Sequence, residues 1–452
     1  MSAATEKMRR EGLPEVAIAT FARYEQRLRA GEQGLVPERE IEPLRQVPAV
    51  DSLPPGDAGA IERAVVLKLN GGLGTSMGMT KAKSLLELRD GLTFLDVTVR
   101  QQLHLRERHG ARLPLLLMNS FATRDDTLAA LERYPDLAVE DLPLDFLQSK
   151  VPKLLADGHE PVSWPAEPAL EWAPPGHGEV FAALASTGLL AELLGRGYEY
   201  LFVSNSDNLG AVLEPRILGW FAAEGLPFAS EVVDRTEGDK KGGHLARRRA
   251  DGRLLLRETA QVPDSDRATF EDVGVHRYFN CNSIWVNLRA LERTLAEHDG
   301  VLELPMIVNR KTVDPADPSS PAVVQLETAM GAAIGVFDGA GAVHAPRSRF
   351  VPVKKTNDLL VVRSDAYALS ADWTLELTAE RGSAPPHVEL DPDHFGLLEE
   401  FEERFASGPP SLAGCERLIV EGDVSFGREV AVRGSVTVSG PRRIADGSLL
   451  EG

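Results

Sequence analysis

Short apolar runs alternate with longer helical patterns between about residue 60 and residue 385. The apolar runs predict six buried strands, at residues 65–69, 115–118, 200–203, 229–233, 282–286 and 341–344. Helical patterns separate the first three of these strands, around residues 92–109, 124–133 and 181–194. This alternation predicts an α/β fold with a mostly parallel, three-layer arrangement of helices and sheet. In such a fold the functional site lies beyond the carboxyl ends of the strands.

The N-terminal part of the chain has a different pattern. Phe21, Tyr24 and Leu28 fall at helical spacing, and glycines follow them. Proline-rich sequence at residues 50–56 then separates this part from the alternating pattern. We therefore predict a helical N-terminal segment over residues 1–55 and an α/β domain over residues 56–385.

The C-terminal part repeats apolar residues every six positions. One series is Leu412, Leu418, Val424, Val430 and Val436, and the second is Val420, Phe426, Val432 and Val438. An ordinary hairpin with a period of two produces part of the same pattern. A sustained period of six favours a short left-handed β-helix over residues 386–452, in which each short face carries one apolar residue. The exposed ends of such a stack are suited to contact between subunits.

Composition narrows the class of protein. The chain has 452 residues, of which 43% are hydrophobic and 26% charged, so it is too apolar for a disordered protein. The net charge of −19 argues against a nucleic-acid partner. The sequence contains no run of about 18 apolar residues, so it predicts no membrane span. The two cysteines are too few for a disulfide framework, which favours a cytoplasmic protein.

The strongest chemical motif follows the first predicted strand. Four glycines stand within eight residues, and lysines come directly after them: Gly71, Gly72, Gly74, Gly78, Lys81 and Lys83. Backbone without Cβ atoms can bring its N–H groups close to a polyphosphate, and lysines supply fixed positive charge. The spacing matches neither a P-loop nor a dinucleotide fingerprint. Taken alone, a glycine loop is about as often only a tight connection between a strand and a helix as it is a phosphate-binding loop.

A second motif ends the strand predicted at 200–203. The sequence Ser-Asn-Ser-Asp-Asn occupies residues 204–208, which places Asp207 at the carboxyl edge of the sheet. A carboxylate in that position is costly unless it meets a cation, and Mg²⁺ with a nucleotide phosphate is a natural partner. The alternative is an aspartate that closes a turn.

These segments resemble one known family. The sequence Leu-Asn-Gly-Gly-Leu-Gly-Thr-Ser-Met-Gly at 69–78, followed closely by Lys-Ser, resembles the nucleotide loop of the eukaryotic-type UTP–glucose-1-phosphate uridylyltransferases, or UDP-glucose pyrophosphorylases. The likeness extends over roughly residues 20–440. It implies a Rossmann-like (GT-A-type) α/β/α nucleotidyltransferase core over residues 56–385. It also implies the reaction of UTP with glucose 1-phosphate to give UDP-glucose and pyrophosphate, with Mg²⁺ and without a protein nucleophile.

The resemblance also implies the roles of individual residues. The nucleotide contacts would come from Leu69, Asn70, Gly71, Gly72, Gly74, Thr75, Met77, Gly78, Gln148, Gly176 and Asn205. The contacts with the sugar and its phosphate would come from His177, Gly243, Glu258, Asn280 and Asn282. The catalytic residues would be Lys83, Lys354 and Asp207, with Asp207 also the ligand of Mg²⁺. Within this set, the resemblance implies that Gln148 reads the uracil edge and that Lys354 holds phosphates as pyrophosphate departs.

Each of these residues has a plainer interpretation when taken alone. An isolated glutamine usually lies on the surface, a histidine beside glycines can stabilise a turn, and Lys354 stands beside another lysine, Lys355. The chain also departs from the usual family sequence, for example with Met-Thr-Lys-Ala-Lys-Ser at 79–84 and Asn-Cys-Asn-Ser-Ile-Trp at 280–285. Three alternatives therefore stay open: a UDP-N-acetylhexosamine or other UDP-sugar pyrophosphorylase, a non-catalytic UDP-sugar sensor, and a scaffold built on the C-terminal repeats.

Overall fold

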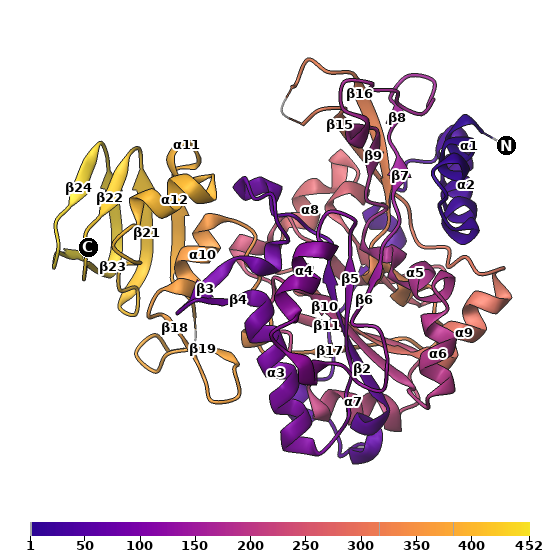
Figure 1. Cartoon of the computed structure of the whole chain (residues 1–452), viewed down its shortest axis with the longest axis horizontal. Coiled ribbons are helices and arrows are strands. Elements are labelled where there is room, and N and C mark those ends of the chain that lie inside the picture. Colours follow the sequence, from indigo (N-terminus) through magenta and orange to yellow (C-terminus); the bar gives the residue numbers. More distant parts are fainter. Residues whose placement is uncertain (1, 316, 383) are drawn as a thin grey trace.

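The computed structural model describes residues 2–315, 317–382 and 384–452, and a large mixed sheet lies at its centre (Figure 1). Among the described residues ten strands belong to this sheet: β1 (Ile41–Pro43), β2 (Ala64–Asn70), β5 (Leu115–Asn119), β6 (Asp145–Leu147), β10 (Tyr200–Asn205), β11 (Phe228–Asp234), β12 (His244–Arg248), β13 (Leu254–Arg257), β14 (Tyr278–Asn287) and β17 (Gly341–His344). Strands β10, β2, β5 and β6 are parallel neighbours. Strand β14 runs antiparallel to both β10 and β11, so β11 shares the direction of the parallel strands.

All six strands expected from the apolar runs are present, as β2, β5, β10, β11, β14 and β17. Strand β2 shows why its sequence is almost continuously apolar. Val65 and Leu67 belong to one hydrophobic core, whereas Ala64 and Val66 belong to another on the opposite face of the sheet. Successive side chains of a strand point to opposite faces, so a central strand covered on both faces must be apolar throughout.

Helices cover both faces of this sheet. Helices α5 (Val180–Ser186), α6 (Leu189–Gly195) and α9 (Leu288–Glu297) contribute to one core, and α3 (Phe94–His109), α4 (Arg124–Leu131) and α7 (Pro215–Ala223) contribute to the other. The predicted helical stretch 181–194 is divided into α5 and α6 at Gly188, whose φ of +78° is left-handed.

One test of these helices concerns membranes. Within the described ranges no single helix is long and apolar enough to cross a membrane. The bent pair His177–Ser186 and Leu189–Gly195 meets the criteria of length and composition only when both helices are counted together.

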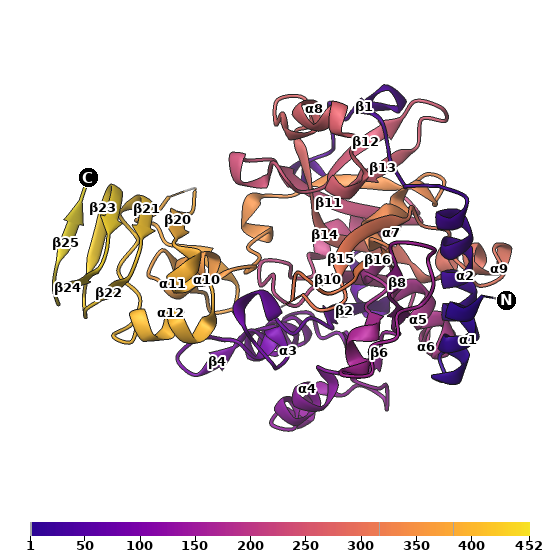
Figure 2. The same ribbon diagram turned by 90° about the horizontal axis from the view of Figure 1, so that it is seen from above.

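Two helices at the N-terminus, α1 (Ala3–Arg10) and α2 (Glu15–Arg29), lie together on one side of the molecule (Figure 2). The predicted helical residues Phe21, Tyr24 and Leu28 are buried on α2. They pack in one hydrophobic core with residues of β7 (Val151–Pro152), β8 (Leu154–Leu155) and β16 (Ala322–Glu327). Strand β16 also pairs with β15 (Ile307–Thr312) in a small separate sheet. The helix expected around these three residues is therefore present as α2, whereas β1, later in the same segment, joins the large sheet.

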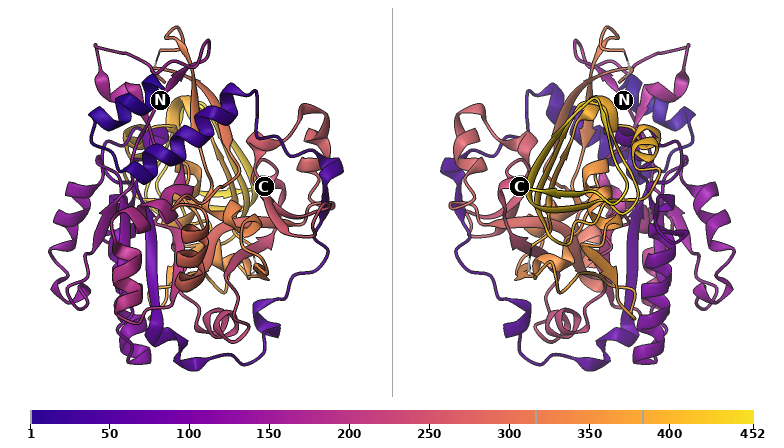
Figure 3. Two further views of the ribbon diagram at one scale, coloured as in Figure 1. Left: turned by 90° about the vertical axis from the view of Figure 1, so that its right-hand side faces the viewer. Right: turned by 90° about the vertical axis from the view of Figure 1, so that its left-hand side faces the viewer.

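The C-terminal strands form the opposite end of the molecule, nearest the viewer in the right-hand panel of Figure 3. They are β20 (His387–Leu390), β21 (Cys415–Glu421), β22 (Val424–Phe426), β23 (Ala431–Ser439), β24 (Arg442–Ile444) and β25 (Leu449–Glu451). Their described pairings are all parallel, and Val420 faces Val438 while Val424 faces Arg442. Parallel pairing excludes the alternative of an ordinary antiparallel hairpin. Both apolar series are buried, apart from the half-buried Val436.

The hydrophobic core of these C-terminal strands extends beyond them. It includes Met77 from the glycine loop, Leu88 and Phe94, which follow the loop, and Leu359 from α10 (Thr356–Arg363). The helices α11 (Pro392–Phe395) and α12 (Leu398–Arg404) contribute Phe395 and Phe401 to the same core. The glycine loop and the C-terminal strands are thus joined by shared apolar packing.

Candidate active site

A cavity of about 270 Å³ opens where β2 and β10 end. The two strands are parallel neighbours, so their carboxyl ends meet at the same edge of the sheet. The wall consists of Leu69, Gly71, Gly72, Lys83, Met118, Gln148, Pro174, Gly176, His177, Asn205, Ser206 and Asp207. All of these except Met118, Pro174 and Ser206 are residues that the sequence singled out. The structure therefore brings most of the predicted nucleotide residues together.

The glycine loop forms one side of this cavity. Gly74 and Gly78 have φ values of +67° and +72°, a conformation that suits glycine. The loop folds back on itself because the backbone N–H of Lys83 donates to the Gly72 carbonyl at 2.9 Å. A Cβ atom at Gly71 would lie only 2.8 Å from the amide nitrogen of Gln148. Glycine at this position therefore lets the loop and the predicted uracil-reading side chain pack directly together.

An ion pair joins the loop to the end of β10. The Nζ atom of Lys83 donates to Oδ2 of Asp207 at 2.7 Å, and both side chains are mostly buried. Among the described residues no donor reaches the buried Oδ1 atom of Asp207. An unpartnered, buried carboxylate oxygen is a suitable ligand for a hard cation such as Mg²⁺. The described residues contain no cluster of three metal-ligating His, Cys, Asp or Glu side chains, so such a cation would take its other oxygen ligands from phosphates and water.

Gly176 and His177 form a further part of the cavity wall. A Cβ atom at Gly176, whose φ is +82°, would collide with the carbonyl of Thr328. The Nδ1 atom of His177 accepts a hydrogen bond from the backbone N–H of Met330 at 3.0 Å, which assigns the ring proton to Nε2. Burial lowers the pKa of His177 to about 4, so the ring is neutral at physiological pH. The imidazole can thus donate a hydrogen bond without carrying a charge.

A second group of predicted residues gathers beside this cavity. The Nδ2 atom of Asn280 donates to Oδ1 of Asn282 at 2.9 Å, and the Asn280 backbone N–H donates to the Gly243 carbonyl at 3.0 Å. A Cβ atom at Gly243 would lie 2.6 Å from the carboxylate of Glu258. Burial raises the pKa of Glu258 above its usual value, and the nearby charge of Lys354 opposes that rise. Four of the five predicted sugar residues, all but His177, therefore form one polar cluster.

The turn at Met330 and Gly331 connects the two groups. The Met330 N–H binds His177 in the cavity wall, and a Cβ atom at Gly331 would lie 3.1 Å from Nδ2 of Asn280. This short piece of backbone therefore contacts both the nucleotide side and the polar cluster. A substrate that spans the two groups would lie across this turn.

Lys354 approaches the site from a separate segment. The backbone N–H of Val353 donates to the Asp207 carbonyl at 3.1 Å, which places the next residue, Lys354, beside the end of β10. The side chain of Lys354 is exposed, and its charge lowers the pKa of both Glu258 and Asp358 against the effect of their burial. Lys354 therefore acts electrostatically on Glu258, a member of the polar cluster.

Five predicted nucleotide residues lie outside the cavity wall: Asn70, Gly74, Thr75, Met77 and Gly78. Asn70 follows Leu69 on the strand and therefore points to the other face, where its amide donates to Asn119 and Thr127. Met77 is buried in the core of the C-terminal strands. Contact of these five residues with a nucleotide stays a prediction, and the structure gives Asn70 and Met77 positions that support the loop.

Sequence reasoning missed several residues of this region. Ser206 stands inside the motif at 204–208, Pro174 lies two residues before Gly176, and Met118 lies near the carboxyl end of β5, which neighbours β2. Lys68 was overlooked although it stands inside an apolar strand. It donates to Ser204 and to the Ala211 carbonyl, and burial lowers its pKa to about 7. A lysine within a buried apolar run is itself an indication that a polar partner lies nearby.

Known proteins resemble the chain over almost its whole length. The family described as UTP–glucose-1-phosphate uridylyltransferase matches residues 18–433. The UTP–glucose-1-phosphate uridylyltransferase of Musa acuminata is 42% identical over 409 residues, which cover 88% of this chain and 85% of the relative. A crystal structure of UDP-glucose phosphorylase from Trypanosoma brucei has a TM-score of 0.93 at 44% identity, covering 99% of this chain and 97% of that one.

A second solved structure carries a ligand. It is a mutant of UDP-glucose pyrophosphorylase from Leishmania major in complex with UDP-glucose. Its TM-score with this chain is 0.94 at 44% identity, and the alignment covers 99% of this chain and 97% of that one. The similarity therefore includes the cavity, the polar cluster and the C-terminal strands.

Proposed function

Because this chain belongs to the UTP–glucose-1-phosphate uridylyltransferase family, we propose that its cavity is the site at which UTP and glucose 1-phosphate give UDP-glucose and pyrophosphate. The observation that carries this proposal is the Lys83–Asp207 ion pair beneath the glycine loop, in the same wall as Gln148 and His177. The backbone N–H groups of the loop, the Lys83 ammonium group and the Asp207 carboxylate together suit the binding of a nucleoside triphosphate.

The reaction is an in-line transfer of the uridylyl group. A phosphate oxygen of glucose 1-phosphate forms a bond to the α-phosphorus of UTP. The bond from that phosphorus to the bridging oxygen of the β-phosphate breaks, and pyrophosphate leaves with the electron pair. Such a transfer needs positioning and charge neutralisation rather than a protein nucleophile.

The nucleotide half of the site has three tasks. The amide of Gln148 hydrogen-bonds the edge of uracil, and the close packing against Gly71 fixes that amide in place. The absence of a side chain at Gly176 lets the backbone approach the uracil ring. Lys83 neutralises phosphate charge, while the neutral His177 donates a hydrogen bond from Nε2 to a phosphate oxygen.

Mg²⁺ is part of this proposal, with Asp207 as its protein ligand. The fit rests on the buried Oδ1 atom of Asp207, which no described donor satisfies. When bound, the ion would neutralise charge on the phosphate oxygens of UTP. The carboxylate meanwhile holds Lys83 in the cavity at 2.7 Å, so Asp207 organises positive charge even before substrate arrives.

The polar cluster is the proposed glucose side. A sugar ring presents several hydroxyl groups, and each hydroxyl that is buried without a partner costs about 1–3 kcal/mol. The amides of Asn280 and Asn282 and the carboxyl group of Glu258 supply donors and acceptors for these hydroxyls. Lys354 lies at the junction with the phosphates, where it offsets charge as pyrophosphate departs.

We infer a Rossmann-like (GT-A-type) nucleotidyltransferase core over residues 56–385 and a left-handed β-helix over residues 386–452. The offset between Val420 and Val438, and again between Val424 and Arg442, equals three of the six-residue repeats. This agreement supports the β-helix. Contact between subunits through this end, and a cytoplasmic location, are further expectations of the same proposal.

The direct test is a mixture of the purified protein with UTP, Mg²⁺ and glucose 1-phosphate, in which pyrophosphate release is measured. Galactose 1-phosphate and N-acetylglucosamine 1-phosphate replace the glucose compound in parallel reactions, and ATP, GTP, CTP and dTTP replace UTP. We expect release that depends on both UTP and glucose 1-phosphate. Release with another sugar alone would transfer the proposal to that sugar, and no release with any pair would contradict it.

A further inference from the structure

Asp207 and Lys354 lie far apart in the chain but are joined by a short bridge. The backbone N–H of Val353 donates to the Asp207 carbonyl at 3.1 Å, and Asn208 forms an antiparallel bridge with Pro352. The segment that leads to Lys354 therefore runs directly along the turn that carries Asp207. The relative position of the two charged residues depends on this contact.

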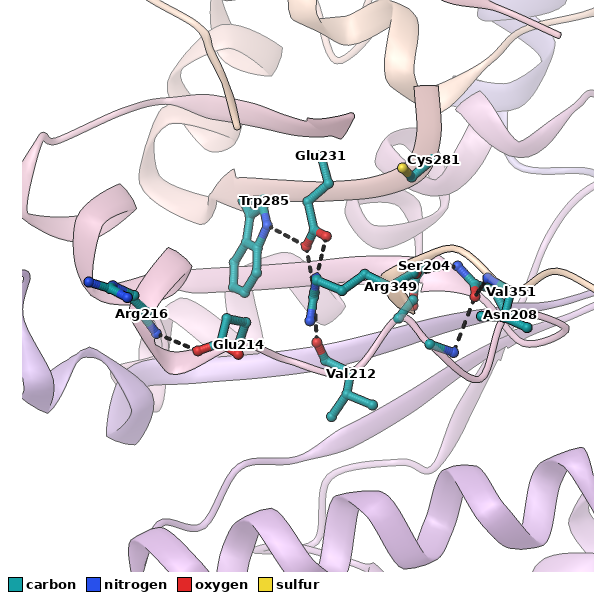
Figure 4. A network of polar contacts seen from close by, with 12 residues as sticks. Ser204, Asn208, Val212, Glu214, Arg216, Glu231, Cys281, Trp285, Arg349 and Val351 are labelled. Carbon is teal, nitrogen blue, oxygen red and sulfur yellow. Dashed lines mark hydrogen bonds and ion pairs between the residues drawn. The ribbon is translucent and has the colours of Figure 1, made fainter. Parts of the chain in front are cut away.

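The side chain of Asn208 holds the bridge together (Figure 4). Its Oδ1 atom accepts hydrogen bonds from the N–H groups of Val351 at 2.9 Å and Gly210 at 3.2 Å. Its Nδ2 atom donates to the carbonyl of Arg349 at 3.1 Å. Asn208 is only 2% exposed, so water does not compete for these bonds. One amide thus ties the turn after β10 to two positions of the segment that precedes Lys354.

A buried ion pair anchors the same segment from the other side (Figure 4). The Nε and Nη2 atoms of Arg349 each lie 2.7 Å from a carboxylate oxygen of Glu231 on β11, and Nη2 also donates to the Val212 carbonyl at 2.8 Å. The indole N–H of Trp285 donates to Glu231 at 3.1 Å. A two-pronged, charge-assisted contact of this kind fixes orientation as well as distance.

The two segments also touch through backbone alone. A Cβ atom at Gly210 would collide with the carbonyl of Ser348, so a larger residue there would push the segments apart. Residues 348, 349, 351 and 353 are therefore each held against the turn at 207–212 or against β11. Lys354, the next residue, has an exposed side chain, and its backbone N–H donates to Oδ2 of Asp358 at 2.8 Å.

We propose that Asn208 and Arg349 are positioning residues for the transfer reaction: they fix the segment before Lys354 against the Asp207 turn and so set where the Lys354 ammonium group meets the phosphates. This inference rests on the role of Lys354 in the proposed function. A misplacement of about 1 Å can lower a rate by about 100-fold, because charge must lie where the transition state develops it. Stability alone explains the buried ion pair poorly, since apolar side chains of similar volume often stabilise a fold as well or better.

The test is a double-mutant cycle of N208A with K354A, with kcat as the measured quantity. We expect N208A to lower kcat by about tenfold when Lys354 is present and by less than about twofold when Lys354 is already alanine, because neighbours that act through one another are not additive. The KM for glucose 1-phosphate should change little in N208A. Binding supplies a readout besides activity: N208A should weaken UTP binding in a calorimeter and leave UDP-glucose binding unchanged.

Asn287 offers a matched control, because its Oδ1 atom also accepts a backbone N–H, that of Ala290 at the start of α9, far from the site. N287A should lower thermal stability. Any change that it makes in kcat should be the same whether residue 354 is lysine or alanine. Should N208A fail to fold, R349K replaces it, because lysine keeps the charge beside Glu231 but loses the two-pronged contact. R349K should show the same dependence on Lys354.

The outcomes distinguish a failure of the positioning role from a failure of the proposed function. An equal loss of kcat by N208A in both backgrounds would overturn the positioning role and leave the proposed function intact. Full activity of K354A in a folded protein would remove Lys354 from the mechanism, and the positioning role would then fall with it. A loss of UDP-glucose binding equal to that of UTP would also overturn the inference, since it would indicate a general disturbance of the cavity.

Discussion

The proposed nucleotide side and the proposed sugar side of the site are built from different groups. The nucleotide side relies on backbone without a side chain at Gly71 and on the Lys83–Asp207 ion pair. The sugar side relies on the neutral amides of Asn280 and Asn282, which hydrogen-bond to each other. One side offers charge and close backbone approach, whereas the other offers directed hydrogen bonds.

This contrast follows the chemistry of the two substrates. Phosphate groups gain charge density in the transition state, so groups that neutralise charge act mainly on the rate. Hydroxyl groups do not change in the reaction, so groups that bind them act on affinity and on the choice of sugar. Variants on the nucleotide side should therefore change kcat, and variants on the sugar side should change KM and selectivity. The predictions below test this division.

The largest effect is expected for D207N. Asparagine keeps the shape of the side chain but removes the charge that pairs with Lys83 and that would hold Mg²⁺, so kcat should fall by about 1,000-fold. Removal of Mg²⁺ with a chelator should lower the rate of pyrophosphate release by the unaltered protein by a similar factor. A D207N protein with more than a tenth of the normal kcat would contradict the role of this carboxylate.

K354A should lower kcat by about 100-fold, because a cation beside the departing pyrophosphate is lost. Thermal stability should hardly change, since the Lys354 side chain is exposed. K355A is the matched control, because Lys355 is the adjacent exposed lysine and should be replaceable without loss of kcat. Equal kcat values for the two variants would show that neither charge acts in the reaction.

G71A should raise the KM for UTP by about tenfold and reduce the preference for UTP over CTP. The added Cβ atom lies 2.8 Å from the Gln148 amide, so it must displace the side chain that reads uracil. G72A provides the comparison within the same loop, because open space surrounds a Cβ atom at that position. Unchanged base preference in G71A would argue that Gln148 does not read the base.

N280A should raise the KM for glucose 1-phosphate by about tenfold, which corresponds to the loss of one hydrogen bond to a hydroxyl group. Its kcat should fall much less than that of K354A. Ratios of kcat/KM for glucose and galactose 1-phosphates measure the accompanying loss of selectivity. A variant that loses kcat without a change in KM would place Asn280 with the charged half of the site instead.

The smallest effect concerns pH and the neutral ring of His177. Its pKa is about 4 in the folded protein and near 6.5 when unfolded, so the unfolded state takes up a proton first as the pH falls. This residue therefore contributes stability above pH 6.5 that is lost between pH 6.5 and pH 4. Melting temperatures across this interval should fall less steeply for H177Q. Parallel curves for the two proteins would contradict a His177 ring that stays neutral in the folded protein.

Much of the fold could be predicted because burial leaves a pattern in the sequence. The run at Val65–Val66–Leu67 identifies a strand covered on both faces, and the six-residue series from Leu412 onward marks buried positions of a region of parallel strands. The strands β12 and β13 were missed, since they are short and β12 ends in Arg247 and Arg248 rather than in apolar residues.

The site could be predicted in its parts but not in its connections. The residues Gln148, His177 and Asp207 stand in recognisable motifs, and the structure gathers them around one cavity. Nothing in the sequence indicates that the amide of Asn208 binds Val351, because a contact between distant segments depends on the whole packing arrangement. Local sequence records what a residue is suited to do, whereas its partners are decided by the tertiary fold.

The shared core of the glycine loop and the C-terminal strands has a consequence for anyone who shortens or fuses this chain. Met77 is buried among C-terminal side chains, and the side chain of Leu397 lies close to Gly78. Removal of residues 386–452 would strip the apolar support from one side of the loop. The C-terminal end is therefore not a separable module. A truncated form would lose the packing that supports the glycine loop, the proposed binding site of the UTP phosphates.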